Sequence, residues 1–143
     1  KKKKRKNQMP NLCENKLVVR GEKEDMAKFL KVINDKTTRS QNLLNAFIPA
    51  PSDEEDLYHW HIENWGTKWD VECFEDATIE DDYAEFSFDS AWGPPVVWLE
   101  KVAKKYPKLK FSLKYEEPGM DFIGCAKGKD GVIVDQSIEC WVK

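Results

Sequence analysis

The sequence predicts an α+β domain in which an antiparallel sheet carries its helices on one face. Several segments alternate apolar and polar residues, which is the period of half-buried strands. Two other segments repeat apolar residues every three or four positions, as amphipathic helices do. The chain has 143 residues, which fits one domain, since domains of about 100 to 150 residues are the commonest. Six Trp, seven Phe and four Tyr supply large side chains for its core.

The first strand and the first helix are predicted between Glu14 and Asn34. In ENKLVVRG, Leu17 and Val19 alternate with charged residues, and the closing glycine ends the strand. The next segment predicts a helix from about Lys23 to Asn34, because its apolar residues fall on one stripe: Met26, Phe29, Leu30 and Ile33.

Two short elements are predicted in the middle of the chain. NLLNAFIPAP favours a short strand, which Pro49 and Pro51 would end because neither can donate to a sheet. SDEEDLYHWHIENWG favours an inserted helix, with Ser52 or Asp53 as its N-cap and Gly66 in the left-handed conformation at its end.

A hairpin is predicted after this helix. Trp69, Val71 and Cys73 share one face of a first strand, EDATIEDD forms the turn, and a second strand alternates Ala84, Phe86 and Phe88 with polar residues. The stretch IENWGTKWD would then form a helix-to-strand corner. We expect Trp69 in the core and Trp65 partly exposed, facing the Tyr115–Asp121 loop and Trp92.

The last third of the chain predicts a helix, a strand and a hairpin. SAWGPPVVWLEKVAKKYP opens a helix at its paired prolines, and Pro107 stops it. KFSLKYEE alternates as a strand, and FIGCAKGKDGVIVDQSIECWVK forms a hairpin turned at residues 129–131. The complete order predicts a ferredoxin-like (split βαβ) antiparallel sheet, with two main helices on one face and an inserted short helix.

The charges divide the chain into a basic start and an acidic body. KKKKRKNQ (residues 1–8) is a block of like charge, which predicts a disordered basic tail ahead of a single domain at residues 9–143. The formal net charge of the whole chain is −3, so the body alone is clearly acidic and is repelled by phosphate backbones. The block is also similar to a nuclear-import sequence, so import is an alternative to a solvated tail.

The cysteine spacing predicts a reduced, cytoplasmic protein with buried free thiols and no bound metal or cofactor. Four widely spaced cysteines form no CxxC pair: Cys13, Cys73, Cys125 and Cys140. In HWHIE, the helical prediction makes His59, His61 and Glu63 diverge, which excludes convergent metal ligation. No apolar run approaches the roughly 20 residues that a membrane span requires.

Four segments in one order resemble the YubB ferredoxin-like domain family of phages and plasmids. They are MPNLCENKLVVRG (9–21), IENWGTKWD (62–70), SAWGPP (90–95) and YEEPGMDFIG (115–124). The resemblance covers residues 9–143. It implies the ferredoxin-like fold and a mobile-element context, and it implies no particular reaction.

A cleft between the tryptophan corners is the predicted binding site. Aromatic rings that stand at element ends often line clefts or interfaces, and nearby charged residues would supply polar contacts. The residues expected there are Trp65, Lys68, Asp70, Trp92, Tyr115, Glu116, Glu117 and Met120. The acids near the Tyr115–Asp121 turn are also candidates for cation binding or acid-base work, against the alternative of solvated loop acids.

Three functions remain open from the sequence. Because no catalytic constellation is recognised, we expect a non-enzymatic accessory protein of a phage or plasmid that binds a host or phage protein through this aromatic and acidic cleft. One alternative is a nucleic-acid-binding protein that uses the basic tail and a lysine run. That run contains Lys101, Lys104, Lys105 and Lys108 and continues to Lys110 and Lys114. The other is a small enzyme or ligand-binding domain.

Overall fold

Six strands form one antiparallel sheet in the computed structural model, which describes residues 12–35, 42–117 and 122–139. The strands are β1 (Leu12–Arg20), β2 (Thr78–Glu80), β3 (Tyr83–Ala91), β4 (Lys110–Glu117), β5 (Phe122–Lys129) and β6 (Val132–Glu139). Their order across the sheet is β2-β3-β1-β4-β5-β6.

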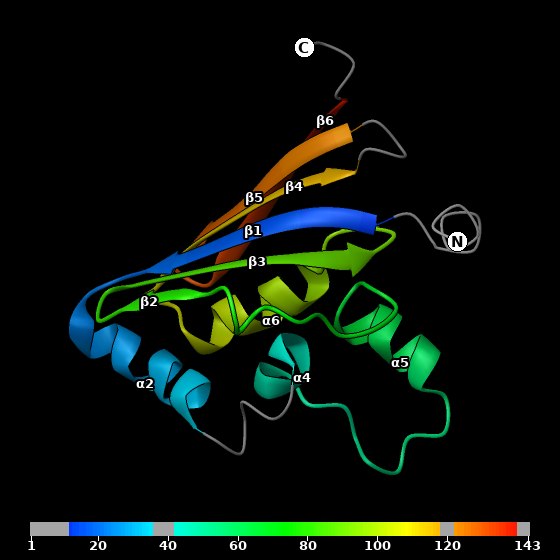
Figure 1. The fold of residues 1–143 in the computed structure, drawn as a ribbon, viewed down its shortest axis with the longest axis horizontal. Coiled ribbons are helices and arrows are strands. Elements are labelled where there is room, and N and C mark those ends of the chain that lie inside the picture. The colour runs from blue at the N-terminus through cyan, green and yellow to red at the C-terminus, as the bar shows by residue number, and fades with distance from the viewer. Residues whose placement is uncertain (1–11, 36–41, 118–121, 140–143) are drawn as a thin grey trace.

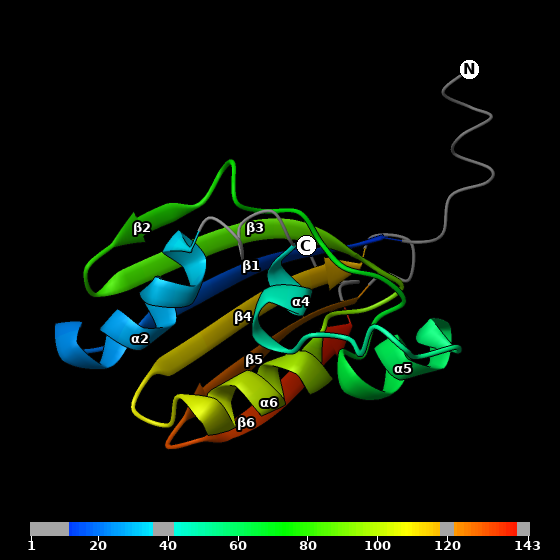
Figure 2. The ribbon, with the colours of Figure 1, turned by 90° about the horizontal axis from the view of Figure 1, so that it is seen from below.

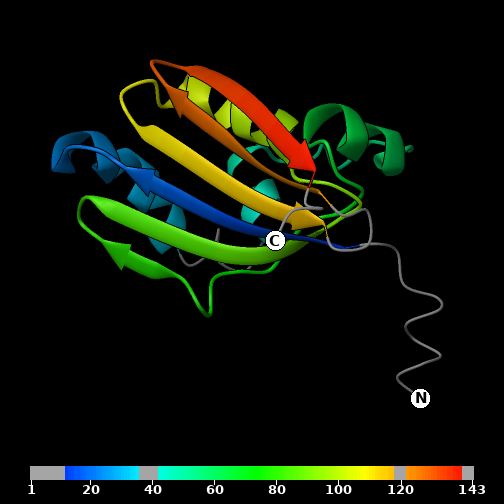
Figure 3. The ribbon, with the colours of Figure 1, turned by 90° about the horizontal axis from the view of Figure 1, so that it is seen from above.

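Four helices lie within these residues, and all of them cover the same face of the sheet (Figure 1). They are α2 (Lys23–Asn34), α4 (Leu43–Phe47), α5 (Leu57–Asn64) and α6 (Val96–Lys105). Seen from below, α2 and α6 cross the sheet, α4 lies between them, and α5 stands at one end (Figure 2). From above, the strands face the viewer with no helix in front of them (Figure 3). We call this uncovered side the open face.

The topology is ferredoxin-like, as the sequence predicts. The strands β2, β3, β1 and β4 and the helices α2 and α6 form the split βαβ unit, in which β1 pairs with both β3 and β4. Residues 35–77, which include α4 and α5, are inserted between α2 and β2. The β5–β6 hairpin extends the sheet beyond β4. None of the described helices is long and apolar enough to span a membrane.

The core lies between the sheet and the helices. Leu17 of β1 stands directly opposite Phe86 of β3 and Leu113 of β4, and all three side chains are buried. The predicted apolar stripe of α2 and one face of α6 cover this layer on the helix side; the buried side chains include Met26, Phe29, Ile33, Leu99 and Ala103. Alternation along each strand therefore separates the core from the open face.

The helix over residues 23–34 has the predicted bounds, and the strand β4 and the last hairpin also form as predicted. The hairpin turns at Asp130 and Gly131, whose φ angles are 55° and 80°. Two successive residues with positive φ are typical of the type I′ turn that suits a tight hairpin.

The segment predicted as a short strand at NLLNAFIPAP is instead the helix α4. The carboxylate of Asp70 accepts hydrogen bonds from the backbone amides of Leu44, at 2.7 Å, and Asn45, at 2.9 Å. These amides belong to the first turn of α4, where they have no partner within the helix. A residue distant in sequence therefore supplies the cap, which local propensity could not predict.

The segment from Trp69 to Cys73, predicted as a strand, is not a strand, because it contacts the start of α4 instead. Asp70 faces the first turn of α4, and the amide of Leu43 donates to the carbonyl of Val71 at 3.3 Å. The segment thus pairs with a helix end and joins no sheet, although Val71 and Cys73 are buried. β3 instead forms its hairpin with β2, which lies within the predicted turn EDATIEDD.

The N-cap of α5 also differs from the prediction. Asp56, rather than Ser52 or Asp53, accepts the amide of His59, so the helix begins at Leu57. At the other end the prediction is confirmed, because Gly66 has a φ of 82° and its amide donates to the carbonyls of His61 and Ile62.

The predicted burial of the two corner tryptophans is reversed. Trp65 is only 2% exposed, and its indole N–H donates to the carbonyl of Ile48 at 2.9 Å. Its ring also stacks on His61, with 4.3 Å between centroids. Trp69 is 47% exposed. Burial of Trp65 is possible because the inserted segment supplies the carbonyl partner that a buried indole needs.

Replacing Trp65 with Ala should therefore destabilise the fold far more than replacing Trp69. We expect Trp65→Ala to cost about 3 to 5 kcal/mol, since it removes a buried ring and leaves the Ile48 carbonyl without its donor. Trp69→Ala should cost less than about 1 kcal/mol. Urea unfolding of both variants and the parent measures this difference, and equal losses would contradict the assigned burial.

Candidate functional site

Two predicted site residues, Lys68 and Trp92, lie together at the corner. The ammonium of Lys68 stands 4.3 Å from the centroid of the Trp92 ring, which is a cation–π distance. Trp92 is 46% exposed, and its φ of 72° turns the chain between β3 and α6. The hydroxyl of Thr67 donates to the carbonyl of Ala91 at 2.9 Å, which joins this turn to the loop after α5.

The other predicted residues do not join them. Trp65 is buried beneath the corner, and Asp70 uses its carboxylate to cap α4. Burial raises the pKa of Asp70, while backbone hydrogen bonds oppose this shift. Both side chains therefore hold the inserted segment in place and are not available to a ligand.

The predicted acidic cluster on β4 is divided between the two faces of the sheet. Tyr115 and Glu117 are buried on the helix side, whereas Glu116 is exposed on the open face. The hydroxyl of Tyr115 donates to Asp135 at 2.6 Å, and its ring passes so close to Gly124 that no Cβ would fit there. Met120, like Asp121, lies outside the described residues.

Glu117 is a fully buried carboxyl group, and neither of its oxygens has a hydrogen-bond partner among the residues that the structure describes. Burial raises the pKa of Glu117 above its usual value of 4.5. Burial, followed by the charge of Glu117, raises the pKa of the Cys13 thiol to about 12. Burial also raises the pKa of Cys73 to about 12. These two thiols stay protonated at neutral pH, which makes them poor nucleophiles.

The predicted free thiols are found in the part of the chain that is described, whereas the absence of a bound metal stays a prediction. Cys13, Cys73 and Cys125 are free thiols; Cys140 lies outside this part. His59 contacts Asp56, and His61 contacts the carbonyl of Lys68, so the two rings do not converge. Over residues 12–35, 42–117 and 122–139, no group of three His, Cys, Asp or Glu side chains could hold a metal ion.

The corner carries an exposed apolar surface that the sequence analysis missed in part. Helix α5 has no buried residue, and its exposed apolar side chains are Leu57, Tyr58 and Ile62. Trp69 and Trp92 are exposed on the loop after α5 and on the turn that Thr67 joins to it. We define the corner surface as Leu57, Tyr58, Ile62, Lys68, Trp69 and Trp92. Acidic residues accompany it on α5 and in the segment that leads into α5: Asp53, Glu54, Glu55, Asp56 and Glu63. Nothing in the sequence distinguishes Leu57, Tyr58 and Ile62 from the apolar residues that a helix buries.

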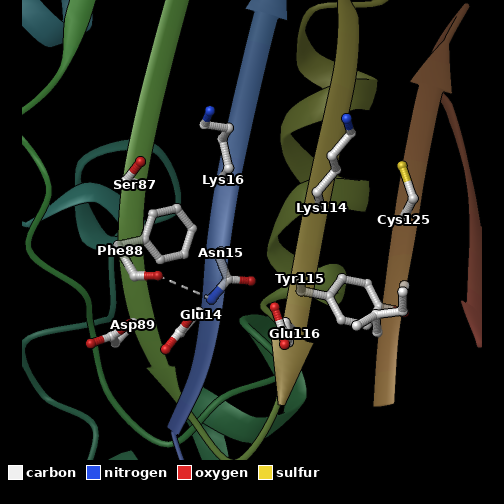
Figure 4. A pocket seen from close by; sticks show the side chains of 12 residues that line it. Glu14, Asn15, Lys16, Ser87, Phe88, Asp89, Lys114, Tyr115, Glu116 and Cys125 are labelled. Carbon is white, nitrogen blue, oxygen red and sulfur yellow. Dashed lines mark hydrogen bonds between the residues drawn. The ribbon is translucent and has the colours of Figure 1, made fainter. Parts of the chain in front are cut away.

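The open face carries a row of three carboxylates that the sequence analysis also missed. Glu14 of β1 stands directly opposite Asp89 of β3 and Glu116 of β4 (Figure 4). The next row holds Lys16 opposite Lys114. These residues line a hollow of about 690 Å³ on the face. The alternation of each strand indicated that these side chains point away from the core, but only the register brings them into rows.

The predicted lysine run is divided in the same way as the acids. Lys101, Lys104 and Lys105 belong to α6 on the helix side, and the ammonium of Lys105 donates to the carbonyl of Phe47 at 3.0 Å. Lys108 lies in the turn before β4. The open face carries the strand lysines Lys110 and Lys114. The run therefore forms no continuous stripe.

Comparisons with known proteins agree with this architecture. Residues 64–142 match the sequence profile of a family described as the ferredoxin-like domain in Api92-like protein. The crystal structure of a protein api92 from Yersinia pseudotuberculosis is similar, with a TM-score of 0.64 and 9% sequence identity, over 91% of this chain and 98% of that chain. No curated protein matches the chain. At this identity the likeness confirms the fold alone, and the phage or plasmid origin stays a prediction.

Replacing Glu117 with Gln should change how stability depends on pH. Because the folded chain binds this proton more tightly than the unfolded chain, the stability that Glu117 contributes is complete below about pH 4.5 and is lost as pH rises through the raised pKa. Glu117→Gln removes that loss, so its stability relative to the parent should be greater at about pH 8 than at about pH 4. Urea unfolding across this range measures the difference.

The matched control is Glu100→Gln, at an exposed position of α6. Its stability relative to the parent should stay nearly constant over the same pH range. If Glu117→Gln behaved like this control, the buried carboxyl would not be the group that titrates.

Proposed function

We propose that this chain, which belongs to the family of ferredoxin-like domains in Api92-like proteins, is a non-enzymatic module that binds another protein through the corner surface. One observation carries the proposal. Large apolar side chains that a folded domain normally covers stand 38–53% exposed on α5 and the loops beside it. Large apolar side chains that stay exposed beside polar residues are typical of protein interaction sites.

The composition of the corner surface supports a protein partner. Tyr and Trp are enriched among the residues that contribute most binding energy at interfaces, and Tyr58, Trp69 and Trp92 are all exposed here. Tyr58 and Ile62 are four residues apart on α5, so they share one face of that helix. The neighbouring acids favour a partner whose apolar contact segment carries basic residues, since complementary charge steers association.

The arrangement of the described thiols and of the β4 carboxyls weighs against catalysis. The pKa of each buried thiol, Cys13 and Cys73, is raised, and the carboxyls of Glu116 and Glu117 lie on opposite faces of the sheet. The sequence resemblance to phage and plasmid proteins extends the proposal to an accessory role in a mobile element, with a host or phage protein as the partner. A cytoplasmic location is part of the same proposal.

Substitutions in the corner surface should weaken binding of the partner without unfolding the domain. Ile62→Glu and Trp69→Ala should each weaken binding of a captured partner at least about tenfold, because each removes an apolar anchor. The matched control is Val134→Glu, which places the same charge on an exposed valine of the edge strand β6. Capture from a host lysate identifies the protein, and titration of the purified pair gives the affinities.

Two results would contradict the proposal. In one, the partner binds the corner variants and the control equally well, which would place recognition elsewhere. In the other, no protein binds and the chain instead converts a metabolite, which would favour the enzyme alternative. Unfolding measurements on each variant separate lost binding from lost structure.

A further inference from the structure

Six basic side chains gather on the open face, on three adjacent strands. They are Lys16 and Arg20 of β1, Lys110 and Lys114 of β4, and Lys127 and Lys129 of β5. All six are exposed. The chain as a whole is acidic, with a net charge of −3. The cluster of basic side chains on this face therefore does not follow from the overall composition.

The register places like charges directly against each other. Lys16 stands opposite Lys114, and Arg20 stands opposite Lys110. Directly opposed like charges on neighbouring strands are destabilising. The nearby carboxylate of Glu85 is already engaged, since it contacts Lys16 at 3.3 Å and accepts the hydroxyl of Tyr83. A bound anion would offset the repulsion that remains.

A hollow of about 410 Å³ lies among these basic residues. Its lining includes the ring of Tyr83 and the small side chains of Val18 and Ser112. The guanidinium carbon of Arg20 stands 5.4 Å from the Tyr83 centroid. A space of this size, with an aromatic ring and a guanidinium, suits a nucleobase, because bases stack on such groups in single-strand sites.

The spacing of these basic residues suits the phosphates of a single nucleic-acid strand. We call this row of basic side chains the track. Residues four apart on a strand are separated by about 13 Å, so Lys110 and Lys114 can each meet a different phosphate of an extended chain. The track has an end, because the carboxylates of Asp89, Glu14 and Glu116 form the row beyond Lys16 and Lys114. That row repels phosphates and would fix where the nucleic acid stops.

We propose that the basic part of the open face binds single-stranded nucleic acid, with phosphates on the lysines of β4 and β5 and one base in the hollow beside Tyr83. A duplex would leave the hollow empty, since its bases are stacked and paired. Because the binding energy comes mainly from phosphate contacts, sequence preference is low and affinity falls with salt. This site is separate from the corner surface and does not depend on the protein-binding proposal.

Fluorescence anisotropy with labelled oligonucleotides tests the site on the full chain. The probes are a 15-nucleotide single strand, as DNA and as RNA, and a duplex of the same length, over a range of salt concentrations. The sheet variant carries Lys110→Gln, Lys114→Gln and Lys127→Gln together. It should bind the single strand at least about 30-fold more weakly at low salt, and its salt slope should fall by about 0.7 for each phosphate that it no longer neutralises.

The matched control changes the same amount of charge on the helix layer, with Lys31→Gln, Lys101→Gln and Lys104→Gln together. It carries the same basic tail, so its affinity should stay within about twofold of the parent if the sheet is the site. Equal losses in the two triple variants, or no loss in either, would overturn the proposal and indicate the tail or general charge. Unfolding midpoints of both variants show whether lost binding reflects lost structure.

A second variant should strengthen binding. Replacing Glu14 and Glu116 with Gln removes most of the acidic row while keeping its shape, so affinity for the single strand should rise about threefold to tenfold at low salt. A decrease in affinity would contradict the role of the acidic row as the end of the binding site. The proposal also fails if the parent binds no single strand at low salt, if the duplex binds more tightly, or if poly-glutamate displaces the oligonucleotide at equal charge.

Discussion

The pairing of β1 on both sides is the constraint on which the rest of the structure depends. Its register with β3 and β4 places Leu17 in a buried row with Phe86 and Leu113, and in the same step places Lys16 on the open face opposite Lys114. A slip of one residue would exchange these two sets, because successive side chains of a strand point to opposite faces. One register therefore fixes both the buried core and the charged rows of the open face.

One indole hydrogen bond fastens the inserted segment to α6, and a second joins two parts of the segment itself. Trp98 donates to the carbonyl of Leu44 at 3.0 Å, and Trp65 donates to that of Ile48 at 2.9 Å. Asp70 caps α4, the helix that contains Leu44 and that Ile48 follows. With the insertion fastened there, α5 lies at the end of the molecule and the open face stays clear of helices (Figures 1 and 3). Both candidate surfaces follow from this placement.

The sequence predicted a helix or strand correctly where the spacing of its own apolar residues decides which side is buried. The stripe of Met26 and Ile33 and the alternation of β3 are such cases. Prediction failed where a distant group decides the conformation: Asp70 makes a helix of the Leu43–Phe47 segment, and the Ile48 carbonyl permits burial of Trp65. The site was harder still, because the charged rows exist only after register brings Glu14 beside Asp89.

An amide-resolved NMR titration of the full, ¹⁵N-labelled chain with a single-stranded oligonucleotide tests most directly whether the two faces of the sheet have separate roles. The account predicts shift changes at residues of β1, β4 and β5 whose side chains occupy the basic part of the open face, with α5 and the core-facing positions unchanged. Changes confined to the basic tail or to α6, or spread evenly through the core, would contradict it.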